Sequence, residues 1–280
     1  MRRLLIGVDE SIEGGNALRW AARLAAELGT DLTVVSAVLP PFEPPTPEDA
    51  ERHRDELAAK LDRLWARSAR SYDVDARTEV VDGDPRQALL EVAARTDADL
   101  VVVGQVGGEG EDPGFLHLGS VAEYLAHHTD RPLAVIPHDG PSRPPGRVVV
   151  GVDGSTESGA AVDWAAALTE QAGGELLAVN VQSPSAERGA ADTPDDWLHF
   201  LVEGQIPQWT RPATDRGVEA TPVAVRARRP AEGLLRAAAD HEADLLVVGA
   251  RGTGGFAGLR LGGTALATLH RADLPLALVP

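Results

Sequence analysis

The sequence contains no cysteine, no apolar run as long as a membrane span, and few basic residues for its number of acidic ones. Without cysteine, disulfides and thiolate chemistry are excluded, which fits a reducing compartment. The amino-terminal apolar stretch before Asp9 is too short for a signal peptide. The 26 basic and 43 acidic residues give a formal net charge of −17, and such a surface repels nucleic-acid backbones and anionic membranes. We therefore expect a soluble, cytoplasmic protein that binds neither.

One sequence pattern is present twice. Three segments of the first half return in the second at offsets of 143 to 145: LLIGVDES as VVVGVDGS, TDADLVVVG as HEADLLVVG, and DRPLAVIP as DLPLALVP. A chain of 280 residues is also long enough for two cores. We predict a first domain over 1–138, a linker rich in proline and glycine over 139–146, and a second domain over 147–280.

Short apolar runs alternate with helical patterns in each copy. In the first copy the predicted strands are 4–8, 32–38, 74–81, 99–103 and 133–136. Between the first two, apolar residues including Trp20 recur at helical spacing up to Gly29, and Trp164 is the counterpart of Trp20. TPED at 46–49 and TPDD at 193–196 predict helix starts, each with a threonine cap. The pattern indicates an α/β fold in which each domain is a five-stranded parallel sheet flanked by helices.

A glycine-rich segment, GARGTGGFAGLRLGGT at 249–264, directly follows the apolar run 245–248. Parallel sheets bind ligands beyond the carboxyl ends of their strands. Backbone amides of glycines there attract phosphate, so those of Gly252–Gly255 would face phosphates. Asp153, at the end of the first strand of this copy, would accept hydrogen bonds from sugar hydroxyls or an adenine amino group. A solvent-exposed turn without a ligand is the alternative interpretation.

The second copy resembles the ATP-binding motif of universal stress proteins. GVDGS at 151–155 is followed by Gly249, two residues, Gly252, nine residues and Gly262. The family pattern then has serine or threonine, whereas here Gly263 holds that place and Thr264 follows. The resemblance implies two Rossmann-like domains of the adenine nucleotide alpha hydrolase-like type that bind ATP, with or without Mg²⁺. The candidate binding residues are Gly151, Asp153, Val181, Gly249, Arg251, Gly252, Gly254, Gly255, Gly262, Gly263 and Thr264.

The first copy keeps only part of this motif. Its interval from Gly107 to Gly119 holds eleven residues and includes Glu109, Glu111 and Asp112. The corresponding candidates are Asp9, Ala37, Gly104, Gly107, Gly119 and Ser120. Residues 1–140 carry 14 basic and 26 acidic residues, against 12 and 17 in residues 141–280. The longer, acidic loop and the more negative half predict that ATP binds in the second copy alone.

Two other functions remain open. One is an interaction module of the same fold that binds no nucleotide. The other is a dinucleotide-dependent enzyme, because GTGGFA at 252–257 matches the dinucleotide fingerprint, with Asp273 about twenty residues beyond. This function is less favoured, since that fingerprint belongs after the first strand of a unit and this segment follows the fourth. We assign no catalytic residue and no metal ligand, since His127 and His128 have no partner at metal-ligand spacing. The favoured function is that of a stress-response or regulatory ATP-binding protein, a homodimer whose protein partners the sequence does not identify.

Overall fold

The computed structural model describes residues 1–9, 11–38, 46–106, 118–138, 145–182, 199–252 and 261–280. The chain divides into two compact units, Met1–Pro144 and Pro145–Pro280. Within the predicted linker only Pro145 and Gly146 are among the described residues, and they begin the second unit. Each unit is described below by itself.

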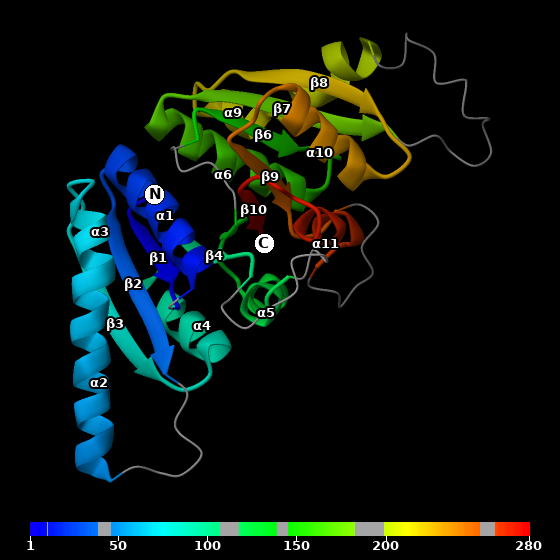
Figure 1. Cartoon of the computed structure of the whole chain (residues 1–280). Coiled ribbons are helices and arrows are strands. Elements are labelled where there is room, and N and C mark those ends of the chain that lie inside the picture. The colour runs from blue at the N-terminus through cyan, green and yellow to red at the C-terminus, as the bar shows by residue number, and fades with distance from the viewer. Residues whose placement is uncertain (10, 39–45, 107–117, 139–144, 183–198, 253–260) are drawn as a thin grey trace. The chain divides into compact units, whose positions relative to one another are not determined.

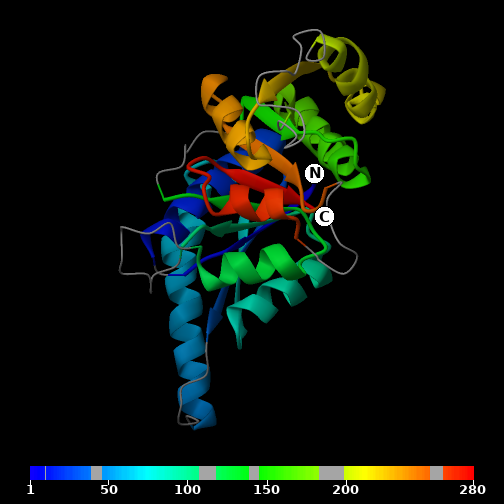
Figure 2. The same ribbon diagram turned by 90° about the vertical axis from the view of Figure 1, so that its right-hand side faces the viewer.

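The first unit is a parallel sheet with helices on both faces (Figure 1). Its strands follow the order β3-β2-β1-β4-β5 across the sheet. The elements in chain order are β1 (Arg3–Gly7), α1 (Ile12–Leu28), β2 (Asp31–Val38), α2 (Pro47–Leu61), the π-helical turn η1 (Asp62–Ala66), α3 (Arg67–Arg70), β3 (Ala76–Asp82), α4 (Pro85–Thr96), β4 (Leu100–Gly104), α5 (Ser120–His128) and β5 (Leu133–Ile136). Helix α2 extends beyond the sheet of its own unit (Figure 2).

The second unit repeats this topology. Its strands follow the order β8-β7-β6-β9-β10 and are all parallel. The elements are β6 (Arg147–Gly151), α6 (Thr156–Ala172), β7 (Glu175–Gln182), η2 (Leu201–Gln205), α8 (Ile206–Trp209), α9 (Arg211–Asp215), β8 (Ala220–Arg226), α10 (Pro230–Asp240), β9 (Leu245–Gly249), α11 (Gly263–Leu269) and β10 (Leu276–Val279). The predicted α/β class, with two Rossmann-like domains of five parallel strands each, is confirmed.

Local signals in the sequence explain where the helices begin and end. Ser11 and Ser155 cap α1 and α6, each accepting a hydrogen bond from a backbone N–H of the first turn. Gly29 ends α1 with a φ of +60°, a left-handed conformation that suits glycine. Thr46 caps α2 as predicted, whereas the second predicted start, 193–196, lies outside the described residues. Trp20, on the apolar face of α1, is 1% exposed, and its counterpart Trp164 on α6 is half-buried.

A carboxylate clamp accounts for the repeated Ala-Asp-Leu motif. Asp99 Oδ2 accepts hydrogen bonds from the backbone N–H groups of Arg2 (2.6 Å) and Arg3 (3.0 Å). Asp244 Oδ2 does the same for Gly146 (3.0 Å) and Arg147 (2.9 Å). In each unit the start of the first strand is thereby attached to the segment that leads into the fourth, which stabilises the pairing of those two central strands.

Candidate functional site

The strand order creates a crevice at one edge of each sheet. In the second unit the chain leaves β6 toward β7 on one side, and later returns to place β9 on the other. Ligands of open α/β sheets bind at such a switch point, beyond the carboxyl ends of the two strands. The segments that follow β6 and β9 here are Val152–Ser155 and Ala250–Gly252, which contain the predicted aspartate and glycines.

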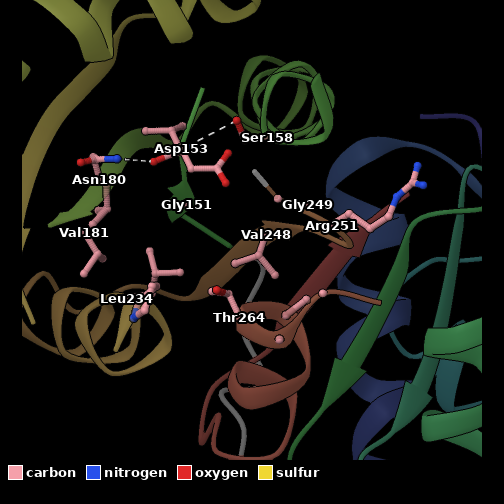
Figure 3. A pocket seen from close by; sticks show the side chains of 17 residues that line it. Gly151, Asp153, Ser158, Asn180, Val181, Leu234, Val248, Gly249, Arg251 and Thr264 are labelled. Atoms are coloured by element: carbon pink, nitrogen blue, oxygen red, sulfur yellow. Dashed lines mark hydrogen bonds between the residues drawn. The ribbon is translucent and has the colours of Figure 1, made fainter. Parts of the chain in front are cut away.

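A cavity of about 540 Å³ occupies this position (Figure 3). Its size falls within the range of roughly 300–1,000 Å³ that is usual for small-molecule sites. It is lined by Gly151, Val152, Asp153, Ser158, Val179, Asn180, Val181, Pro230, Leu234, Val248, Gly249, Arg251, Gly252, Gly262, Gly263, Thr264 and Ala265. The structure thus brings nine of the eleven residues predicted for the second copy to one cavity. The other two, Gly254 and Gly255, lie outside the described residues.

Asp153 is held at the mouth of the cavity by the helix that follows it. Its Oδ1 accepts hydrogen bonds from the backbone N–H (3.0 Å) and the hydroxyl (2.5 Å) of Ser155, the N-cap of α6. The backbone N–H of Asp153 is 3.5 Å from the Ser158 hydroxyl (Figure 3). The carboxylate is exposed, and each of its oxygens has two lone pairs, so it can accept hydrogen bonds from a ligand.

Two glycines bring the loop after β9 close to α6 and to Asp153. A Cβ on Gly252 would lie 2.6 Å from Asp153 Oδ2. A Cβ on Gly249 would lie 2.9 Å from the carbonyl carbon of Glu157, in the first turn of α6. The contact at Gly249 is with backbone and excludes a side chain there, so this glycine allows the loop to approach α6; the contact at Gly252 is with the end of the exposed Asp153 side chain, which would have to move. Their spacing therefore has a structural cause in addition to any contact with a ligand.

The first turn of α11 closes the opposite side of the cavity. Gly262 is the N-cap of this helix, and its N–H donates to the Ala250 carbonyl at 2.7 Å. A Cβ on Gly263 would meet no atom within 4 Å. Thr264 lines the cavity in Figure 3, one residue after the place where the family pattern has its hydroxyl. The cavity therefore has a hydroxyl near this helix start, although Gly263 supplies none.

Arg251 turns away from the centre of the cavity (Figure 3). Its Nη2 is 3.0 Å from Glu157 Oε1, and the two side chains are 48% and 25% exposed. This ion pair fixes the arginine to the first turn of α6. The predicted residue is part of the lining, but its charge is already paired with a carboxylate of the protein.

Asn180 is a lining residue that the sequence prediction missed. It is 4% exposed; its Nδ2 donates to the Val152 carbonyl at 2.7 Å, and its Oδ1 accepts from Gln182. The first of these bonds joins β7 to the segment that follows β6, beside the cavity (Figure 3). An asparagine inside an otherwise apolar strand is a detectable signal, because a buried amide must have partners. Leu234 and Pro230 of α10 were also missed, and nothing in their local sequence indicates a ligand site.

The first unit has the same cavity in reduced form. A cavity of about 170 Å³ is lined by Gly7, Val8, Asp9, Gly14, Val35, Ala37, Pro85, Leu89, Val103, Gly104, Val106, Gly119, Ser120, Val121 and Ala122. All fifteen are sequence counterparts of residues that line the larger cavity. Of the six candidates predicted here five are in this lining, and Gly107 lies outside the described residues.

Polar groups and space both distinguish the two cavities. Val121 stands where the second unit has Thr264, and Val106 where it has Arg251. A Cβ on Gly7 would lie 2.7 Å from Leu89 Cδ1, whereas the same atom on Gly151 would lie 3.1 Å from Leu234. The leucine of α4 therefore lies closer to the strand end than the leucine of α10. The first cavity is smaller and offers fewer polar groups to a ligand.

The described residues contain no cluster of His, Asp and Glu that could hold a metal ion, and no described helix is long and apolar enough to cross a membrane. GTGGFA starts at Gly252 after β9, and Asp273 precedes β10. This loop therefore does not follow the first strand of its unit, where a dinucleotide fingerprint belongs.

Comparison with known proteins agrees with this architecture. The model of the universal stress protein family matches residues 1–137 and again 145–280. Universal stress protein Rv2623 of Mycobacterium tuberculosis is 32% identical over 292 residues, with 97% of this chain and 94% of the relative covered. Universal stress protein Mb2019 of Mycobacterium bovis is 30% identical over 307 residues, with 97% and 93% covered. The crystal structure of a universal stress protein from Archaeoglobus fulgidus superposes with a TM-score of 0.72 at 18% identity, with 99% and 97% covered. The chain therefore belongs to the universal stress protein family and carries two copies of its domain.

Proposed function

We propose that this protein binds ATP, with or without Mg²⁺, in the cavity of its second unit, and that it acts as a regulatory or stress-response nucleotide-binding protein. One observation carries the proposal. The glycines with the family spacing and Asp153 lie around a single cavity of about 540 Å³ at the switch point of the sheet.

The two ends of the cavity suit the two ends of a nucleotide. Val181, Leu234 and Val248 provide an apolar surface for a base, and Asp153 provides acceptors for ribose hydroxyls or an amino group. At the other end, Gly252 and the Gly262–Thr264 turn bring backbone amides and a hydroxyl to the place for phosphates. Bound in this way, the phosphates of ATP would be held mainly by backbone N–H groups, which glycines leave accessible.

Binding without fast turnover follows from the same lining. Among the described residues that line the cavity, the ionisable ones are Asp153 and Arg251. The first is held by Ser155 and the second is paired with Glu157, so neither is positioned as a free acid or base. A regulatory role through occupancy of the site therefore suits this lining better than hydrolysis does.

The alternative for the protein is an interaction module of the same fold that binds no nucleotide, and the first unit offers an observation in its favour. Its cavity of about 170 Å³ is below the usual size for a small-molecule site. We propose that this unit keeps the fold without holding nucleotide.

Mass spectrometry of small molecules released from the purified, denatured protein tests the proposal. An adenine nucleotide, lost together with binding in calorimetry when Gly252 is changed to aspartate, would support it. Protein that releases no nucleotide and gives no heat with ATP or with Mg²⁺ and ATP would contradict it.

A further inference from the structure

The charges around the fourth helix of the repeat are reversed between the two units. Residues 226–236 contain four arginines and one glutamate, whereas their counterparts, 81–91, contain three acidic residues and one arginine. We call the four arginines of the second unit the arginine edge: Arg226, Arg228, Arg229 and Arg236. All four are exposed.

The arginine edge lies beside the cavity, on the outer side of α10. Ala227, between Arg226 and Arg228, donates its N–H to the Gln182 carbonyl at 3.1 Å. This bond places these arginines at the carboxyl end of β7. Arg236 Nη2 donates to the Arg226 carbonyl at 2.6 Å, so the guanidinium group of Arg236 lies against the end of β8. Pro230 and Leu234 of the same helix line the cavity.

The position of Arg229 is electrostatically unfavourable for the helix itself. Arg229 is the N-cap of α10 and makes no side-chain capping bond. Helix amino termini favour negative charge, and a cation there opposes the helix dipole. In the first unit the counterpart is Asp84, which caps α4 by accepting from the Arg86 N–H. The second unit has therefore exchanged a stabilising cap for a cation, and a residue that lowers local stability without a structural gain indicates a function.

The arginines also differ from their counterparts in pairing. Among the residues that the structure describes, Arg228 and Arg229 make no hydrogen bond through their side chains and no ion pair. In the first unit Asp82 pairs with Arg54, and Asp84 with Arg86. On a chain of net charge −17, two exposed guanidinium groups with no partner among the described residues, beside two others, form a local positive surface.

The extent of the arginine edge decides the kind of partner. Arg229 and Arg236 are seven residues apart on α10, about 10 Å along the helix axis. This span exceeds a single phosphate group and suits several carboxylates on an extended chain. A nucleic acid would bring its long negative backbone close to the rest of an acidic protein, which a short peptide avoids. We propose that the arginine edge docks an acidic segment of a partner protein.

Fluorescence anisotropy of a labelled ten-residue oligo-glutamate peptide with the full chain tests this proposal at low and at physiological salt. We expect salt-dependent binding, and we expect Arg228→Asp combined with Arg229→Asp to weaken it about tenfold or more. The matched control is Arg211→Asp with Arg271→Asp, which changes the net charge equally at two exposed arginines of α9 and of the segment after α11.

A stability measurement separates loss of docking from loss of folding. Because Arg229→Asp restores the cap that Asp84 provides in the first unit, this variant should melt at a higher temperature than the parent while binding the peptide more weakly. The proposal is overturned if the parent does not bind the peptide at low salt, if the control weakens binding equally, or if a ten-nucleotide oligothymidylate binds more tightly than the peptide. The docking proposal does not depend on nucleotide binding. The outcomes of these experiments therefore leave the proposed binding of ATP untested.

Discussion

At the scale of single residues, Asp153 is the most direct test of the proposed site. One of its oxygens is used by Ser155, and the other faces Gly252. Asparagine in its place keeps an acceptor for Ser155 and removes the acceptor available to a ligand. We expect Asp153→Asn to weaken ATP binding about tenfold in calorimetry, the cost of a hydrogen bond to a charged group.

Asp9 provides the matched control, because it holds Ser11 in the first unit as Asp153 holds Ser155. Asp9→Asn should leave the affinity for ATP unchanged. A larger loss from Asp9→Asn than from Asp153→Asn would place the nucleotide in the first unit.

Gly263 allows a prediction of improved binding. It replaces the hydroxyl residue of the family pattern, and a Cβ there would have open space. Gly263→Ser should raise ATP affinity several-fold by adding one hydrogen-bond donor, about 1 kcal/mol. Thr264→Val, which copies Val121 of the first unit, should lower it by a similar factor. Calorimetry with both variants checks the pair, and unchanged affinity in both would mean that no phosphate lies at this turn.

Asp97 predicts a dependence of stability on pH. Its pKa is lowered, mainly by the hydrogen bond from Arg131 and also by the charge of Arg3. A carboxyl whose folded pKa lies below its unfolded value of about 3.9 stabilises the protein above that pH. This contribution is lost as the pH falls through the folded value.

Asp97 has a φ of +51°, which asparagine also adopts, so Asp97→Asn removes the charge with little change of backbone. Thermal melts should show a destabilised variant at pH 7 and a difference that shrinks as the pH is lowered below about 4, the unfolded value. A difference that stays equal as the pH is lowered would exclude the ion pairs as its cause.

At the scale of elements, helix α10 packs closely on β7 through Gly233. A Cβ on Gly233 would lie 2.5 Å from Val181 Cγ1. The first unit has alanine at both equivalent positions, Ala88 on the helix and Ala37 on the strand. In the second unit the helix residue is smaller and the strand residue is larger, so side-chain volume is shifted from the helix to the strand. Gly233→Ala should lower the free energy of unfolding by about 1–2 kcal/mol, since overpacking exceeds the gain in helix propensity.

A double-mutant cycle tests this exchange of volume. Val181→Ala alone should also destabilise the second unit, because it leaves a small void. The combination of Gly233→Ala and Val181→Ala reproduces the first unit and should be more stable than the sum of the single changes predicts. Additive effects in denaturant unfolding would show that α10 shifts without contact with Val181.

The elements show how far the sequence alone could lead. The apolar run 133–136 coincides with β5, and Gly29 ends α1 as predicted, because strand burial and helix caps depend on neighbours in the sequence. Leu234 and Asn180 were not predicted as lining residues, because their place depends on how α10 and β7 meet at the switch point. The pairing of Arg251 with Glu157 was not predictable either, since it joins residues about ninety positions apart.

At the scale of the whole molecule, one duplicated sequence has produced two unequal cavities. Fifteen equivalent residues line both, yet their volumes are about 540 and 170 Å³. The unit with the smaller cavity also belongs to the more acidic half, with 26 acidic and 14 basic residues over 1–140. Both differences disfavour a triphosphate in the first unit. Equivalent residues on an equivalent fold therefore line cavities of unequal size.

The asymmetry predicts a stoichiometry of one ATP per chain. Calorimetry should give one site, and sedimentation should separately give the number of chains per particle, for which we expect two. Gly252→Asp should reduce ATP affinity about a hundredfold or more. The new side chain adds a second carboxylate where phosphate must approach, and its Cβ would lie 2.6 Å from Asp153 Oδ2. Gly107→Asp, at the counterpart position in the sequence, should change little. Two equivalent sites per chain, or binding that survives Gly252→Asp and is lost in Gly107→Asp, would show that the first unit holds nucleotide. In that case neither the size of a cavity nor the charge around it decides which copy of the repeat binds.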